Sequence, residues 1–262
     1  MRLKPGLVSV TMRNLLPEDV ISLAKRAGLH GIEWGADVHV PPGDVKNAFS
    51  VGESTRKSGL SCACYGSYCK MTDEERADGV FESVVNAAKS LGAPLIRVWA
   101  GNRGSKDSDK SYFSEISENA SRIGDLAEKH GIRIAFEHHG GTLTDDAAYE
   151  ARLLQAINHP NIGALWQPPV HLSATERLEG LKLISPWLSN IHAFSWQGYE
   201  RLPLSDNEEE WLSYLSHASS TPGERYVLLE FVKDDDPQQL LRDADVLLGW
   251  LRRTASGVKK WN

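Results

Sequence analysis

The chain repeats one pattern from end to end, in which a short run rich in Val, Ile and Leu precedes a longer stretch of helical period. Eight such pairs fit into 262 residues, at about 33 residues for each pair. Strands that alternate with helices favour parallel pairing, because each helix returns the chain to the start of the next strand. Eight consecutive units predict an α/β fold, a single (β/α)8 TIM barrel, which we expect to form one domain over residues 1–262.

The apolar runs and the periodic stretches give the expected elements. The predicted strands are 7–12, 31–40, 60–69, 94–101, 132–139, 161–169, 188–196 and 225–233. The predicted helices are 17–28, 44–58, 73–92, 111–131, 145–158, 174–185, 208–220 and 238–253. A doubly wound sheet is the alternative arrangement of such units, but the first strand runs into Thr11-Met12-Arg13-Asn14 without a G-x-G-x-x-G phosphate loop.

Composition and charge exclude several classes of protein. The chain has 29 basic and 35 acidic residues and a net charge of −6, which argues against a nucleic-acid partner. No apolar run reaches the roughly 18 residues of a membrane span, and the first residues do not resemble a signal peptide. The cysteines, Cys62, Cys64 and Cys69, are odd in number and clustered, so we expect free thiols and a cytoplasmic location.

Four later strands each carry one metal-ligating side chain close to the carboxyl end, where barrel enzymes have their active sites. These side chains are Glu137, Gln167, His192 and Glu230. Two carboxylates that converge in this way repel one another, and a divalent cation removes the conflict. Carboxylate and amide oxygens with an imidazole nitrogen suit Mn²⁺, Co²⁺, Zn²⁺ or Mg²⁺. We therefore predict one divalent metal ion held by these four residues.

Other polar and aromatic residues fall on the same rim. Arg97 and Trp99 are two positions apart on one strand and so share a face, and His139 follows Glu137 by two. Aromatic faces and hydrogen-bond donors together suit a sugar ring. The predicted substrate-binding residues are Glu33, His39, Tyr65, Arg97, Trp99, His139, His171 and Lys233.

These motifs resemble the xylose isomerase-like TIM-barrel superfamily, which includes sugar phosphate isomerases and epimerases and, more distantly, endonuclease IV. The matching features are Glu137, the W-Q-P-P at 166–169, His192 and Glu230, with G-I-E-W at 31–34 and I-R-V-W-A-G at 96–101. The resemblance covers essentially the whole chain. It implies that Glu137 and Glu230 are acid and base as well as metal ligands, and that His192 is the third ligand.

The sequence departs from that family at one ligand position. Gln167 stands where the family usually has Asp, so two Glu ligands balance a doubly charged ion and the site becomes neutral. We expect weaker retention of the ion and a more Lewis-acidic metal.

The leading hypothesis is a metal-dependent sugar isomerase or epimerase that abstracts a proton next to a carbonyl and passes through an enediolate. A lyase that performs β-elimination on 3-keto-glycosides needs the same groups. A third alternative is a non-catalytic carbohydrate-binding barrel. DNA repair like that of endonuclease IV would need more ligands and a basic surface. The expected partner is a small carbohydrate, without nucleic acid or membrane. The oligomeric state is open, with a homo-oligomer among the states considered.

Overall fold

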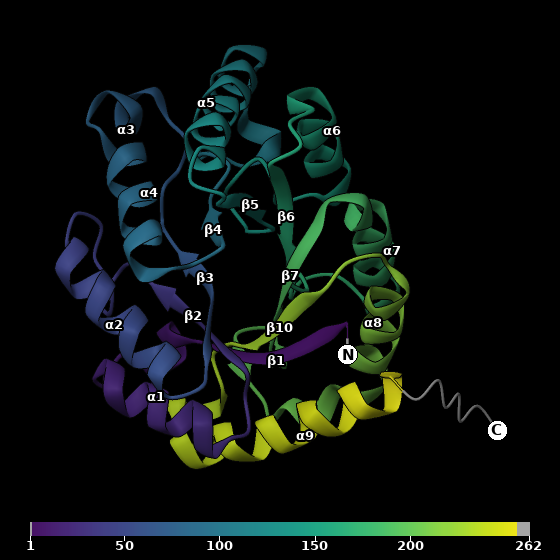
Figure 1. Ribbon diagram of the computed structural model, residues 1–262. Helices are drawn as coiled ribbons and strands as arrows, with labels where there is room; N and C mark the ends of the chain where they lie inside the picture. Colours follow the sequence, from purple (N-terminus) through teal and green to yellow (C-terminus); the bar gives the residue numbers. More distant parts are fainter. Residues whose placement is uncertain (1, 256–262) are drawn as a thin grey trace.

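The computed structural model describes residues 2–255 and confirms the (β/α)8 barrel. The barrel strands close in the order β1-β10-β7-β6-β5-β4-β3-β2, and Figure 1 shows them at the centre of a ring of helices. The strands are β1 (Leu3–Val8), β2 (Gly31–Gly35), β3 (Ser61–Gly66), β4 (Leu95–Val98), β5 (Arg133–Glu137), β6 (Ile162–Trp166), β7 (Leu188–Ala193) and β10 (Arg225–Leu229). The helices are α1 (Pro17–Arg26), α2 (Val45–Lys57), α3 (Asp73–Ala77), α4 (Val80–Leu91), α5 (Lys110–Glu128), α6 (Ala147–Ile157), α7 (Ala174–Ile184), α8 (Glu208–Ser220) and α9 (Pro237–Ala255).

The first strand lies earlier than the sequence predicted. Residues 9–12 form a 3₁₀ turn, and β1 instead includes Pro5 and Gly6, a pair typical of turns. Gly6 is required there because a Cβ would lie 2.5 Å from the Leu228 Cδ2 atom and 2.7 Å from the Gly31 carbonyl oxygen. Close packing of the closed barrel therefore overrides the local turn signal.

Most strands are shorter than predicted, as β2 (Gly31–Gly35) is within 31–40, and two further elements differ in their organisation. The helix predicted at 73–92 is divided into α3 and α4 at Gly79, whose φ of 71° lies in the left-handed region that glycine tolerates. The strand predicted at 188–196 ends at Ala193, and a small hairpin follows, formed by β8 (Trp196–Gln197) and β9 (Glu200–Arg201). This hairpin extends the loop between β7 and α8 at the carboxyl end of the barrel.

Side chains of the strands alternate between the helices and the interior of the barrel. Ile96 and Phe136 belong to the large apolar core that includes buried residues of the helices, whereas Leu95 and Ala135 lie in a separate buried cluster with Cys64 and Leu165. The inward positions two residues beyond Leu95 and Ala135 are Arg97 and Glu137. The alternation thus carries polar side chains into the carboxyl end of the barrel interior.

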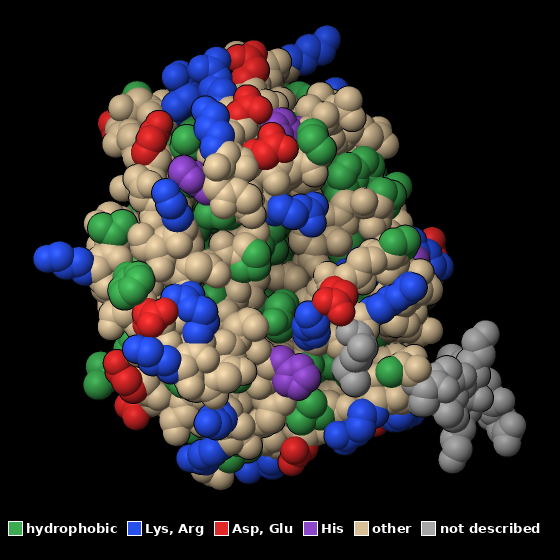
Figure 2. Space-filling view, viewed as in Figure 1, with side chains coloured by type: hydrophobic (Ala, Val, Ile, Leu, Met, Phe, Trp, Pro, Cys, Tyr) green, Lys and Arg blue, Asp and Glu red, His purple; other side chains and the backbone are tan. Residues whose placement is uncertain are grey.

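On the face shown in Figure 2, acidic and basic side chains are interspersed. None of the helices within residues 2–255 combines the length and apolar character that a bilayer crossing requires.

Candidate active site

Five ionisable side chains from five strands meet inside the carboxyl end of the barrel, and none is more than 5% exposed. They are Glu33 on β2, Arg97 on β4, Glu137 at the end of β5, His192 on β7 and Glu230 directly after β10. Charges at this depth are stable only when they are paired or bound to an ion. The site therefore carries strong electrostatic coupling among residues far apart in sequence.

Three members of this group have the composition of a metal centre. Glu137, His192 and Glu230 each offer a ligand atom, and these atoms lie within 4.8 Å of one another. The His192 Nδ1 atom lies 3.4 Å from Glu137 Oε1 and 3.3 Å from Glu230 Oε2. Nδ1 is nevertheless buried without a hydrogen-bond partner among the described residues. An orphaned imidazole nitrogen between two carboxylates fits a divalent cation, which would use all three atoms as ligands.

The second oxygen of Glu137 is held by two donors. Arg97 Nη1 lies 2.6 Å from Glu137 Oε2, and the indole nitrogen of Trp99 donates to the same oxygen over 2.5 Å. Burial alone would raise the pKa of the Glu137 carboxyl, but Arg97 and His192 outweigh burial and hold this pKa well below its usual range. Glu137 is consequently an ionised group with one oxygen, Oε1, turned to the cluster.

Glu33 is engaged through both of its oxygens. Its Oε1 accepts from Arg97 Nε over 3.0 Å, and its Oε2 accepts from His192 Nε2 over 3.1 Å. Burial, which would raise the pKa of Glu33, is outweighed by His192 and Arg97, so the pKa is lowered. The side chain is 0% exposed. The sequence placed Glu33 among the substrate-binding residues, and in the structure it is a buried member of the cluster whose two oxygens are engaged by Arg97 and His192.

Gln167 follows β6 and contacts the backbone of His138, the residue after Glu137. Its Nε2 donates to the carbonyl oxygen of His138 over 2.9 Å, which fixes the orientation of the amide. Within residues 2–255 the amide nitrogen supplies the side chain's hydrogen bond, and the amide oxygen is left without one. An oriented amide with an unused oxygen is compatible with a neutral ligand, and the role of Gln167 as a fourth ligand remains a prediction.

An aromatic wall lines the mouth on the side of β3, β4 and β5. The rings of Trp99 and His139 stack with centroids 4.6 Å apart and an angle of 29° between planes, and Tyr68 meets Trp99 edge-on at 5.3 Å. The Arg97 guanidinium lies 5.0 Å from the Tyr68 ring. Arg97, Trp99 and His139 were predicted from the sequence, and the structure brings them together.

A second aromatic group, on the side of β7 and β10, did not appear in the sequence prediction. Phe194 and Phe231 both pack against Trp196, with centroid distances of 5.4 and 5.9 Å. The available signal was position, since Phe194 follows His192 by two residues and Phe231 follows Glu230 directly. Trp196 belongs to the β8–β9 hairpin, which the sequence did not reveal.

Four predicted substrate-binding residues are not part of the cluster. His39 is buried with one ring nitrogen bonded to Ser9 Oγ and the other to the Leu15 carbonyl, at 3.0 and 3.1 Å. Tyr65 is fully buried and donates its hydroxyl to the Val40 carbonyl over 2.9 Å. Both side chains therefore have structural partners. His171 is exposed and acts electrostatically on Glu176, and Lys233 is half-buried.

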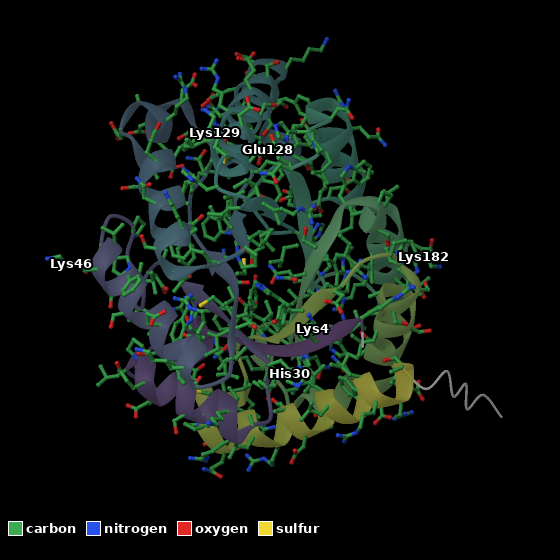
Figure 3. The ribbon with its side chains drawn as sticks, viewed as in Figure 1. Lys4, His30, Lys46, Glu128, Lys129 and Lys182 are labelled. Atoms are coloured by element: carbon green, nitrogen blue, oxygen red, sulfur yellow. The ribbon has the colours of Figure 1, made fainter. Side chains whose placement is uncertain are left out.

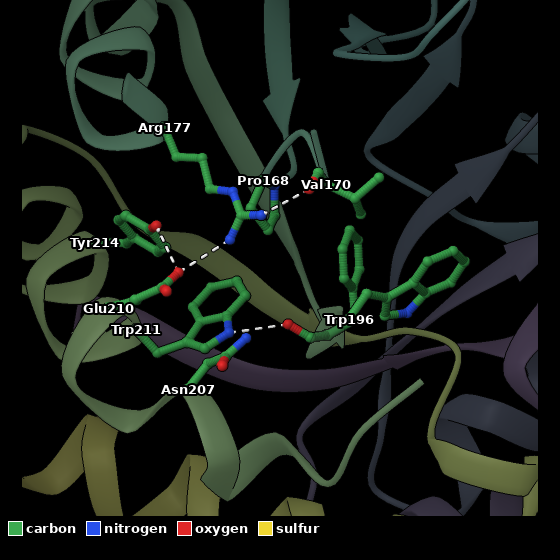
Figure 4. A pocket seen from close by; sticks show the side chains of 9 residues that line it. Pro168, Val170, Arg177, Trp196, Asn207, Glu210, Trp211 and Tyr214 are labelled. Atoms are coloured by element: carbon green, nitrogen blue, oxygen red, sulfur yellow. Dashed lines mark hydrogen bonds and ion pairs between the residues drawn. The ribbon is translucent and has the colours of Figure 1, made fainter. Parts of the chain in front are cut away.

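A small pocket of about 10 Å³ lies beside the mouth, between α7, α8 and the loops after β6 and β7 (Figure 4). Arg177 forms an ion pair with Glu210 at 2.9 Å and donates to the carbonyl oxygens of Pro169 and Val170. Trp211 donates to the Phe194 carbonyl over 2.9 Å. These contacts tie helices α7 and α8 to the loops that follow Gln167 and His192.

A second group with metal-ligating side chains lies outside the barrel interior. It consists of Asp125, Glu128 and His159, of which the two acids are exposed and the histidine half-buried. Figure 3 labels Glu128 at the end of α5, in the ring of helices. His159 Nε2 already pairs with Asp125 at 3.2 Å, and its Nδ1 accepts from the Asn161 N–H. This group has ordinary surface pairing and is not a candidate for the active site.

Comparison with known proteins adds relatives of the same architecture. The curated 3-dehydroshikimate dehydratase of Bacillus anthracis is 22% identical to this chain over 281 aligned positions, covering 98% of this chain and 94% of that protein. The crystal structure of the probable 3-DHS dehydratase AsbF of Bacillus anthracis has a TM-score of 0.79 at 19% identity and covers 94% of this chain and 98% of its own.

A third similar structure is that of an epimerase. The structure of D-psicose 3-epimerase with D-tagatose, from Clostridium cellulolyticum H10, has a TM-score of 0.72 at 14% identity and covers 96% of this chain and 99% of its own. At these identities the structural likeness establishes the fold. The model of the family described as "Xylose isomerase-like TIM barrel" matches residues 21–248, which is most of the chain. This chain therefore belongs to the xylose isomerase-like TIM-barrel family.

Proposed function

We propose that the protein is a divalent-metal-dependent enzyme that removes a proton from the carbon next to a carbonyl in a small carbohydrate-like substrate. One observation carries this proposal: the buried Nδ1 of His192, which has no hydrogen bond within residues 2–255, lies between the carboxylates of Glu137 and Glu230 at the carboxyl end of the barrel. Pure binding of a sugar would not require two buried carboxylates around an orphaned imidazole nitrogen.

The residues of the cluster have distinct expected roles. Glu137, His192, Glu230 and the amide oxygen of Gln167 would hold the ion. A divalent ion, when bound, polarises the substrate carbonyl and favours the enediolate. Glu230 and Glu137 would remove the proton and return it, as general base and acid. Return to the same carbon from the opposite face gives epimerisation, and return to the neighbouring carbon gives isomerisation.

Elimination is the second candidate, and two observations favour it. A curated relative of matching length is a dehydratase. In addition, Glu137 receives two hydrogen bonds on Oε2, whereas the Glu230 side chain pairs with His192 alone within residues 2–255, so the two carboxylates are unequally available as proton carriers. In an elimination the base takes the proton, the C–H electron pair forms the new C=C bond, and the group on the β carbon leaves as water or alcohol with a proton from an acid.

The test is turnover in heavy water with protein loaded separately with Mn²⁺, Co²⁺, Zn²⁺ or Mg²⁺. Free ketoses, 3-keto-glycosides and 3-dehydroshikimate serve as substrates, and NMR follows deuterium at the carbon next to the carbonyl. Epimerisation or isomerisation yields a deuterium-labelled isomer of the substrate, and elimination yields a product with a new C=C bond and loss of water or alcohol. Sugar binding without exchange or product under every metal would leave the carbohydrate-binding barrel as the better account.

A further inference from the structure

We propose that Glu33 is a positioning residue that fixes the His192 ring so that Nδ1, and not Nε2, is the metal-ligating nitrogen. The inference rests on the proposed metal site and assigns to Glu33 a role other than substrate binding. Glu33 is not in the group of candidate ligands, and both of its oxygens are already engaged.

The contact with His192 determines which ring nitrogen is free. Because a carboxylate only accepts, the 3.1 Å contact requires His192 Nε2 to carry a proton and donate it to Glu33 Oε2. The other nitrogen, Nδ1, then faces Glu137 Oε1 and Glu230 Oε2 at 3.4 and 3.3 Å. A carboxylate on the far nitrogen of a ligating histidine sets its tautomer and ring orientation and raises its basicity.

Arg97 makes Glu33 and Glu137 parts of one rigid unit. Its Nε donates to Glu33 Oε1 over 3.0 Å while its Nη1 donates to Glu137 Oε2 over 2.6 Å. The guanidinium is planar and presents these donors in a fixed geometry. The Glu33–Arg97 pair therefore orients two candidate ligands. Glu33 holds His192, and Arg97 holds Glu137.

The backbone of β3 leaves room for this unit. A Cβ at Gly66 would lie 2.7 Å from Glu33 Oε1 and 2.7 Å from Arg97 Nη2. Only a residue without a side chain fits beside the pair, so the placement of Glu33 is supported by a neighbouring strand as well as by its own partners.

The experiment compares Glu33→Gln with Glu150→Gln, using Mn²⁺ and Zn²⁺ as probes. Glu150 is a matched control because it is also fully buried and also pairs with a histidine, His138 Nδ1 at 2.7 Å, which is not a candidate ligand. Calorimetric titration should show about 10- to 100-fold weaker metal binding in Glu33→Gln. The Glu150→Gln variant should bind metal with nearly unchanged affinity.

Nitrogen NMR of the wild-type histidines supplies a readout that does not depend on the variant folding. The Zn²⁺-loaded wild type should show His192 ligated through Nδ1 with a proton on Nε2. Ligation through Nε2, or equal metal affinity in wild type and Glu33→Gln, would overturn the role of Glu33. Failure of the wild type to bind either ion would instead remove the proposed metal function, and the metal-free spectrum would still show whether Nε2 holds the proton bonded to Glu33.

Discussion

The indole N–H of Trp99 donates to the Oε2 atom of Glu137 over 2.5 Å, from the loop after one strand to the end of the next. Hydrogen bonds to charged groups contribute about 1.5–3 kcal/mol to stability. Trp99→Phe should therefore lower the free energy of unfolding by about that amount. The Phe ring can still stack on His139, so the wall of the mouth is kept. Urea unfolding of both proteins measures the difference, and an unchanged midpoint and slope would show that this bond contributes nothing.

Glu137→Gln and Glu230→Gln should each reduce turnover by at least about 10²-fold, the usual size of general acid–base catalysis. The two variants should differ in stability. Glu137→Gln leaves the buried Arg97 charge without one of its two carboxylate partners, and breaking such a pair costs about 3–5 kcal/mol. Glu230 has no arginine partner within residues 2–255, so thermal unfolding should change much less. Near-normal turnover of both variants at saturating metal would exclude them from the reaction.

Gln167→Asp should tighten metal binding, because it adds a negative charge to a neutral set of ligands. The same change removes the Nε2 donor to the His138 carbonyl, so the metal-free protein should become less stable. Calorimetric titration and thermal unfolding without metal measure these opposite effects. Equal or weaker affinity in the Asp variant would show that position 167 does not contact the ion.

Metal binding should strengthen as the pH rises. Burial lowers the pKa of the His192 imidazole, but the carboxylates of Glu230 and Glu33 outweigh it and raise the pKa well above 6.5. The metal-free protein therefore holds a proton on His192 that the ion must displace, and affinity should rise by about tenfold per pH unit below the folded-state pKa.

The same shift affects the stability of the metal-free protein with the opposite sign. A raised histidine pKa adds stability that is fully present below pH 6.5 and is lost as the pH rises through the folded-state value. For the metal prediction, calorimetric titrations of the ion in two buffers of different ionisation enthalpy count the proton that His192 releases on binding. Binding without proton release at neutral pH would contradict the assignment.

Gly66→Ala should disrupt the Glu33–Arg97 pair, because its Cβ would lie 2.7 Å from both partners. Such overpacking costs about 1–3 kcal/mol, and metal affinity should fall with it. Gly140→Ala is the matched control, since a Cβ there meets no atom within 4 Å. Loss of stability in both variants to the same degree would mean that the site is not sensitive to this contact.

The barrel could be predicted because its signal is distributed over the whole chain. Eight repeats of strand and helix survive errors at individual ends, such as the displacement of β1 and the break at Gly79. Those errors share one cause: Pro5, Gly6 and Gly79 have local preferences, and only tertiary packing decides whether a strand or a helix continues through them.

The convergence of Glu137, His192 and Glu230 could be predicted because the carboxyl ends of parallel strands meet at one end of the barrel, while their role as metal ligands stays a prediction. Partners inside the site could not be found, since the sequence does not say which donors a carboxylate will meet. Glu33 was predicted to lie on the rim. Its buried contact with His192 depends on strand register, because the pairing of β2 with β3 shifts between Ile32 and Glu33. His39 and Tyr65 were placed at the mouth, although neighbouring loops supply backbone carbonyls that hold them in the interior.

The pairing of β1 with β10 has a consequence for synthesis of the chain. Leu3 pairs with Arg225 and Leu7 with Leu229. The first strand to be synthesised therefore lacks this pairing until the last strand has been made. Until then the nascent sheet keeps an open edge, a state prone to pairing with other chains. Glu230 follows β10 directly, so the carboxylate that completes the cluster arrives in the same step that closes the barrel. A growing chain released before β10 would therefore lack both the closed barrel and the Glu230 carboxylate of the proposed metal site.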